Sequence, residues 1–224
     1  MRKVQEIAED KARNSIMLRY ASVFIKNLPI ETIDALKNFK TIDIPKLIPS
    51  FMNIQKGKAM DHALKFVVEF CIRVRKSKDK TVHNLALYFF AERDKPDELL
   101  EFLRVEEAKK QEGHAIWFEV DYALNVCKQK EKELGDRKRQ PSGSAAGSGL
   151  DYKEAEVMIK KIKKAQIILY AILGLHDKAV KLSLECQDIQ MAKDYANKPL
   201  DKKLKKKLWM KIAKYLFNYP SKKA

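Results

Sequence analysis

The sequence predicts an all-α protein, an α-solenoid of antiparallel helix pairs. In nearly every ordered segment apolar residues recur at steps of three and four, whereas the alternation typical of strands is scarce. The composition agrees, since 46% of the 224 residues are hydrophobic and 34% charged, with only seven Gly and seven Pro. A third observation is a weak internal repeat, in which the pair of segments 87–91 and 98–103 is echoed by 169–173 and 178–182. Repeated helix pairs can bury together the apolar faces that one pair alone would expose.

The first part of the chain begins with a long helix that ends near Pro29. One stripe of this helix carries apolar residues at helical spacing: Ile16, Tyr20, Val23, Phe24 and then Leu28. A short second helix follows, and we expect Ile33 and Leu36 to face inward. Asp43 is a candidate cap for a short third helix, because the two prolines of segment 45–49 limit helix propagation.

Further helices are predicted up to residue 127. The apolar spacing from residue 58 to about 74 indicates a helix, and Thr81 is the expected N-cap of the next. Asp94 and Pro96 open another helix, and a further one begins with residues 117–127. Because the connections are short, neighbouring helices should pack antiparallel.

A Ser/Gly-rich tract divides the array. We expect residues 1–134 to form the first part of the solenoid, 135–149 a flexible loop or linker, and 150–224 the continuation, since the tract cannot bury enough apolar surface to become ordered. We interpret it as a loop within the array, native or engineered, not as a domain boundary. A helix should run from Ala155 to Leu173 and stop at Gly174 in a left-handed conformation. Three last helices are predicted over 177–184, 189–196 and 203–217.

Short segments in four regions of the chain resemble a known family in its own order. Residues 169–184 are similar to the last clathrin-heavy-chain-type repeat of the vacuolar protein sorting eighteen, or Pep-three, family. The other similar segments are 20–24, 32–36 and 45–49 near the start, 70–71, 82–85, 98–103 and 121–124 in the middle, and 191–199 and 205–213 at the end. The resemblance spans roughly residues 15 to 215. It departs from the family over 128–164, which look like an insertion or replacement, and by lacking the family's propeller and zinc-binding RING.

This resemblance implies a clathrin-heavy-chain-repeat-like solenoid fragment and a non-enzymatic scaffold. Members of the family are core subunits of the HOPS and CORVET complexes, which tether endosomal and vacuolar membranes and assist fusion. The partners implied are other tethering-complex subunits, with SNARE proteins or anionic membrane as further contacts. The implied location is cytoplasmic, peripheral on late endosomes and the vacuole or lysosome.

The residues themselves offer little for catalysis, cofactors or metals. No Gly-rich phosphate loop, HExxH or nucleophile elbow occurs, and the four histidines are dispersed. We expect His83 to be a hydrogen-bonded structural histidine, and Cys71 and Cys127 to be buried and inert. We expect a cytosolic protein, because the three cysteines are widely spaced and no signal peptide is found. We also expect no membrane span, because no apolar run is longer than nine residues. The predictions are therefore no enzyme, no cofactor and no metal.

The basic charge is concentrated in the C-terminal part. Residues 128–224 carry 24 Lys and Arg against 11 Asp and Glu, whereas residues 1–127 carry 22 against 19. An apolar stripe of Leu204, Leu208, Ile212 and Leu216, with Trp209 beside it, is surrounded by Lys202, Lys203, Lys205, Lys206, Lys207, Lys211 and Lys214. These lysines are the candidate contact for an acidic partner or anionic lipid, although a solvated face of a packed helix explains them as well.

Two alternatives remain open at this point. A basic helical-repeat protein could bind nucleic acid by releasing counterions, but the basic residues include few arginines and no interleaved aromatic platform, so nucleic acid is not favoured. A generic protein-interaction solenoid would differ from the tethering scaffold only in its partner.

Overall fold

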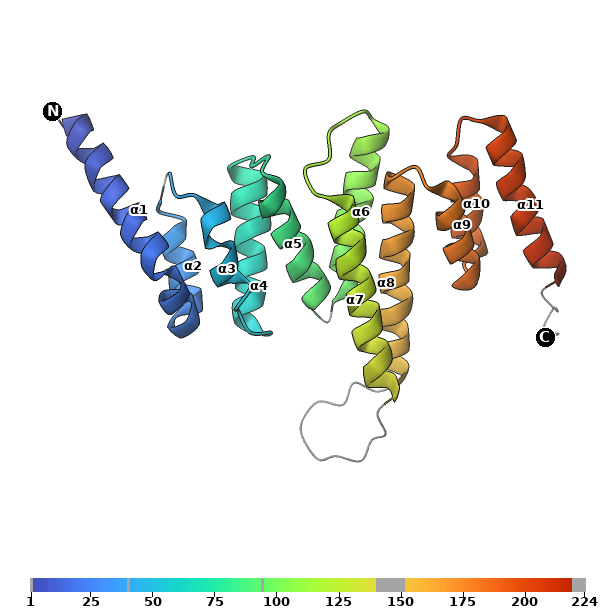
Figure 1. Cartoon of the computed structure of the whole chain (residues 1–224), viewed down its shortest axis with the longest axis horizontal. Helices are drawn as coiled ribbons and strands as arrows, with labels where there is room; N and C mark the ends of the chain where they lie inside the picture. The colour runs from blue at the N-terminus through green and yellow to red at the C-terminus, as the bar shows by residue number, and fades with distance from the viewer. Residues whose placement is uncertain (1, 40, 94, 140–151, 219–224) are drawn as a thin grey trace. The chain divides into compact units, whose positions relative to one another are not determined.

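The computed structural model describes residues 2–39, 41–93, 95–139 and 152–218, and within these ranges it contains helices and no strand. This confirms the all-α prediction (Figure 1). The chain divides into two compact units, which are described separately. Unit 1 is drawn from residues 1–93 and 117–119, and unit 2 from residues 94–116 and 120–224.

The described residues of unit 1 form five α-helices with a 3-10 turn and a π-helix between them. They are α1 (Arg2–Asn27), α2 (Pro29–Leu36), η1 (Ile44–Leu47), α3 (Ile48–Phe51), α4 (Lys58–Lys65), η2 (Phe66–Val74) and α5 (Lys80–Glu92). The core is aromatic: Phe51 stacks on Phe66 with ring centroids 6.1 Å apart and meets Phe89 edge-on at 6.4 Å. All three rings are buried, so they tie α3, η2 and α5 together.

Helix α1 packs on α2 and α3 through a face that differs from its most apolar stripe. From residue 11 onward the buried residues of α1 are Met17, Ala21 and Ile25, whereas Ile16 is 56% and Val23 53% exposed. The other members of the predicted stripe are exposed too: Tyr20, Phe24 and Leu28. We call the exposed residues Ile16, Tyr20, Val23 and Phe24 the α1 stripe.

Of two local predictions in unit 1, the helix over 58–74 is confirmed and the cap at Thr81 is wrong. The segment 58–74 is helical throughout, but after Lys65 its hydrogen bonding changes from α to π, as the bond from the Arg75 N–H to the Phe70 carbonyl illustrates. The cap of α5 is Asp79 instead of Thr81, because the Asp79 carboxylate accepts the backbone N–H of Thr81 at 2.8 Å. The predicted cap of the short third helix lies where expected, since η1 and α3 follow Asp43, but its side chain makes no capping hydrogen bond.

Unit 2 contains α6 to α11. They are α6 (Pro96–Gln111), α7 (Val120–Arg139), α8 (Tyr152–Ile172), α9 (His176–Glu185), α10 (Ile189–Asn197) and α11 (Lys202–Asn218). Helices α7 and α8 lie side by side and antiparallel (Figure 1), and the main packing contacts join helices one or two steps apart along the chain. Such short-range packing is typical of repeat architectures.

Two predicted boundaries in this region are wrong. Helix α7 starts at Val120 and not at Trp117, because Phe118 is buried in unit 1 and the Glu119 N–H is bonded to the Asn84 side chain there at 3.0 Å. The same helix continues through Arg139, so residues 135–139 are not part of a loop. Residues 140–149 of the predicted Ser/Gly loop lie outside the described residues.

The turn between α8 and α9 has the predicted left-handed glycine. Gly174 has φ +74°, and the N–H groups of Gly174 and Leu175 donate to the carbonyls of Ala171 and Tyr170, both at 2.9 Å. The next turn repeats this arrangement without a glycine, since Gln187 has φ +61°. The predicted last three helices are confirmed as α9, α10 and α11.

Candidate partner-binding surface on α11

Helix α11 is held in unit 2 by a small apolar contact. Its start is capped by Asp201, whose carboxylate accepts the Lys203 N–H at 2.9 Å. Only Leu208 and Ile212 are buried, so the middle of the predicted apolar stripe is packed, while Leu204 is half-buried and Leu216 is 44% exposed. The indole N–H of Trp209 donates to Asn197 of α10 at 3.1 Å. The outer face of α11 therefore remains accessible.

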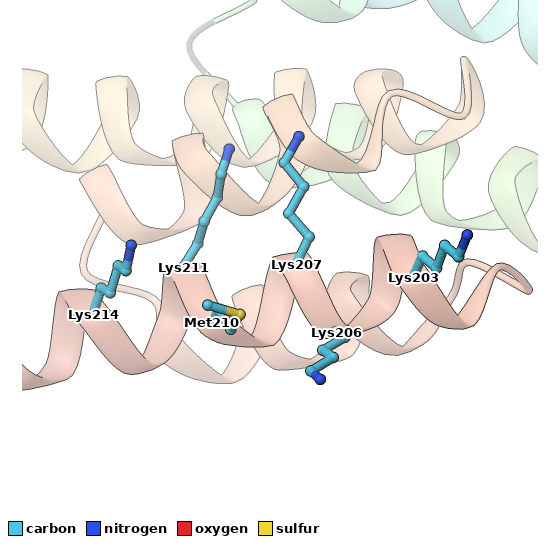
Figure 2. A pocket seen from close by; sticks show the side chains of 6 residues that line it. All are labelled: Lys203, Lys206, Lys207, Met210, Lys211 and Lys214. Atoms are coloured by element: carbon cyan, nitrogen blue, oxygen red, sulfur yellow. The ribbon is translucent and has the colours of Figure 1, made fainter.

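Five of the seven predicted lysines gather around one hollow on this helix. The hollow has a volume of about 370 Å³ and is lined by Lys203, Lys206, Lys207, Met210, Lys211 and Lys214, which we call the lysine groove (Figure 2). Figure 2 shows Lys207 and Lys211 extending to the same side of the ribbon, while Lys206 extends to the other side of Met210. Lys202 is exposed but lies outside the lining, and half-buried Lys205 also lies outside it.

The positive charge of the groove is largely uncompensated. Lys211 pairs with Asp177 of α9 at 2.6 Å, but none of the ion pairs found among the described residues involves the other four lysines of the groove. Lys203 and Lys207 are four residues apart, as are Lys207 and Lys211, and like charges at this spacing cost a helix about 0.2–0.5 kcal/mol per pair. The first turn of α11 contains no acidic residue, so its lysines also lie at the unfavourable end of the helix dipole. Helix stability alone does not account for this arrangement.

The sequence pattern indicates the lysines but not two further residues that complete the surface. Met210 lies in the centre of the groove and is 52% exposed, a position that a purely solvated basic face would not require. Asp177 neutralises Lys211 from another helix, which a one-dimensional pattern cannot reveal. The spacing of Met210 from Lys206 and Lys214, four residues each, was the signal available for the first of these.

A second polar cluster in unit 2 lies beside a hollow of about 490 Å³ between α6, the α8–α9 turn and α10. Glu107 accepts from Lys198 at 2.7 Å and from the Tyr195 hydroxyl at 3.3 Å. Burial, reinforced by the nearby Glu107 charge, raises the pKa of Tyr195. Because the charge of Glu107 is neutralised by Lys198 within the cluster, we interpret these contacts as holding the end of α10 against α6.

The remaining candidate residues have separate surroundings. His62 pairs with Asp34 at 2.9 Å, and His83 bonds to the Ser77 carbonyl at 2.8 Å, which confirms its hydrogen-bonded structural role. Burial raises the pKa of both Cys71 and Cys127 to about 12, so the expectation that they are buried is confirmed. Within the described ranges no three His, Cys, Asp or Glu side chains are grouped as metal ligands, and no helix there is long and apolar enough to cross a membrane.

The chain matches the model of a known protein family over both of its units. The model of the family described as "VPS18, alpha-solenoid domain, second half" matches residues 2–134 and 154–217, which is most of the chain. The chain belongs to the VPS18 family. The match includes the lysine groove of unit 2 and the α1 stripe of unit 1. No solved structure matches the chain.

Curated VPS18 relatives agree over nearly the same span. The chain is 26% identical over 207 residues to the vacuolar protein sorting-associated protein 18 homolog of Danio rerio, covering 91% of this chain and 18% of the relative. The vacuolar sorting protein 18 of Arabidopsis thaliana is also 26% identical, with 92% of this chain and 18% of the relative covered. The vacuolar membrane protein pep3 of Schizosaccharomyces pombe is 21% identical over 98% of this chain and 21% of its own length. The chain thus spans about a fifth of the relatives it matches.

The VPS18 comparison confirms the suspected family and narrows the predicted departure from it. The sequence suggested that residues 128–164 were inserted or replaced, but the family match leaves only 135–153 uncovered between its two segments. The flanking residues belong to α7 and α8, which pack against each other as one pair. The departure therefore falls at the connection between paired helices.

Proposed function

We propose that this chain is a non-enzymatic scaffold segment that acts in vacuolar protein sorting. The observation that carries the proposal is the VPS18 solenoid match, which runs in order through both units. The names of the Arabidopsis thaliana and Danio rerio relatives point to the same process. Stacked helices present long surfaces on which several partners can bind, which suits a scaffold.

The finer proposal is that the chain is the solenoid part of a HOPS or CORVET core subunit. In this role it binds other tethering-complex subunits and supports the tethering and fusion of endosomal and vacuolar or lysosomal membranes. Its location is cytoplasmic and peripheral on those membranes, where SNARE proteins or anionic lipids are further contacts. The α1 stripe supports a role in protein binding, because exposed apolar residues that follow one another on a helix mark interaction sites.

A binding experiment with purified tethering-complex subunits tests this proposal. The 224-residue chain is immobilised, and each HOPS and CORVET subunit is applied at physiological salt. We expect at least one subunit to be retained, and to be lost when Tyr20→Asp and Val23→Asp place charges in the α1 stripe. Ser15→Asp with Ser22→Asp is the matched control, because these exposed residues of α1 receive the same charge outside the stripe.

Two results would overturn the scaffold proposal. One is retention of no subunit by a chain whose circular dichroism and thermal unfolding show that it is folded. The other is tight, sequence-sensitive binding of RNA that responds steeply to salt, which would instead favour the nucleic-acid alternative.

A further inference from the structure

The outer face of α11 carries an ordered seam of side chains. Residues 203, 206, 210, 213 and 217 follow one another at steps of three, four, three and four, so they lie along one line of the helix. Lys203 and Lys206 supply amines at the start of this line, and Met210 and Phe217 supply apolar side chains further along. Met210 is 52% and Phe217 92% exposed. A line with this spacing matches the contact line of a second α-helix.

The charges indicate what kind of helix would fit. Four lysines of the lysine groove take part in none of the ion pairs found among the described residues, and they repel one another along α11. Carboxylates placed against them would relieve this repulsion and the unfavourable charge at the start of the helix. The groove around Met210 is hollow, so an apolar side chain can enter between the lysine stems.

We propose that the lysine groove binds an acidic α-helix of a partner protein. Carboxylates of that helix face the amines of the groove, and its apolar side chains cover Met210 and Phe217. Such a helix is defined by its chemistry, whether or not the partner belongs to a tethering complex.

A membrane fits this surface less well. A helix that lies on a membrane separates its basic and apolar residues onto opposite faces. On α11, Met210 and Phe217 lie on the same line as Lys203 and Lys206, so basic and apolar residues are not separated, and the other apolar pair, Leu208 and Ile212, is already buried in the protein. Trp209, the aromatic residue best suited to a membrane interface, is held to Asn197 through its indole N–H.

The experiment compares two labelled helical peptides by fluorescence anisotropy with the 224-residue chain. The first peptide carries glutamates at one end of its seam and leucines at the other, and its isomer contains the same amino acids with the leucines moved off the seam. Vesicles of mixed phosphatidylserine and phosphatidylcholine form a third arm. We expect the seam peptide to bind about tenfold more tightly than the isomer, and binding to weaken as salt rises. Vesicles should not sediment the chain.

Matched variants locate the binding. A triple variant should bind the seam peptide about tenfold or more weakly; it combines Lys203→Glu, Lys206→Glu and Lys207→Glu. Changing the exposed lysines Lys128, Lys132 and Lys153 of α7 and α8 to Glu gives the same charge change and should alter binding by less than about threefold. Met210→Asp should weaken binding of the seam peptide, while Met210→Leu should leave this binding unchanged.

Three results would overturn the proposal. Equal binding of the two peptides would show that the groove recognises only the charge of the peptide and not the position of its leucines. An equal effect of the control lysines would place the contact elsewhere. The third result is that the wild-type chain sediments with anionic vesicles but does not bind the seam peptide. If the triple glutamate variant then no longer sediments with the vesicles, the surface binds membranes. Circular dichroism of each variant shows whether the fold is kept, and the peptide comparison on the wild-type chain stands even if a variant fails to fold.

Discussion

Two glycines of unit 2 offer a controlled test of the turn geometry. Gly174 lies in the α8–α9 turn with φ +74°, whereas Gly135 lies inside α7. A Cβ atom built at either position meets no heavy atom within 4 Å, so neither substitution by alanine is opposed by a clash. The two changes therefore differ only in the backbone conformation that alanine must adopt.

The expected effects have opposite signs. An L-residue in the left-handed region costs roughly 1–2 kcal/mol, and the smaller entropy of the unfolded alanine chain offsets part of this, so Gly174→Ala should destabilise by about 1 kcal/mol. Gly135→Ala should stabilise by about 0.8–1 kcal/mol, because alanine is favoured over glycine inside a helix. Gly174→Val should cost more than Gly174→Ala, since a β-branched side chain tolerates positive φ poorly, and Gly174→Asn should cost less.

Urea unfolding can measure this difference in unit 2 alone. Trp117 belongs to unit 1 and Trp209 to unit 2, and the sequence has only these two tryptophans. In a Trp117→Phe background the fluorescence therefore reports on unit 2. The two alanine variants should differ by about 2 kcal/mol in the free energy of unfolding. Equal effects of the two substitutions would refute the left-handed turn at Gly174.

Four further outcomes are expected. Gln187→Gly should stabilise unit 2 by up to about 1 kcal/mol in the same urea assay, because Gln187 has φ +61°; a loss of stability would contradict this. Asp188 is part-buried, which raises its pKa, but the bonds from Lys164 and the Met191 N–H outweigh that effect and hold the pKa below 3.8. Its stabilisation is therefore complete above about pH 4 and lost as pH falls through the lowered pKa, so Asp188→Asn should flatten the acid limb of the stability profile. Cys71 and Cys127, whose pKa values are about 12, should not react with Ellman's reagent at about pH 8 until the chain unfolds. Amides of α11 should exchange hydrogen faster than those of α8, which buries many more side chains; equal protection by mass spectrometry would argue against a weakly held α11.

Helical periodicity predicted which segments are helices but not every face that they bury. In α1 the larger apolar residues Ile16, Tyr20 and Val23 indicated one face, yet α2 and α3 pack on Met17, Ala21 and Ile25. Two apolar stripes on one helix give no local reason to prefer either, and the small Ala21 permits close approach of neighbouring backbone. The choice therefore depends on tertiary packing.

Other differences arise where one spacing is compatible with two backbone geometries. Apolar residues at 66, 67, 70 and 71 are consistent with an α-helix, but the hydrogen bonds of η2 are π-type, and a sequence of side chains does not report such a change. The glycine at position 174 predicted a left-handed turn, whereas the same conformation at Gln187 could not be predicted because no glycine stands there. The lysines of the candidate site were visible in the sequence because charge clusters are local, but the pairing of Lys211 with Asp177 needed the fold.

The conflict between stability and charge on α11 explains why function is best sought there. Most helices of unit 2 gain from their local sequence: α9 starts with an acidic first turn, and α10 starts with an Asp188 cap. Helix α11 has a cap but otherwise starts with lysines, repeats them at the spacing of greatest repulsion and buries only Leu208 and Ile212. Replacing a few of these lysines by glutamate would remove the repulsion without touching that contact. Proteins commonly depart from such local rules where a surface is used for binding, so a lysine groove beside an exposed Met210 favours the proposed acidic partner over an origin in helix stability.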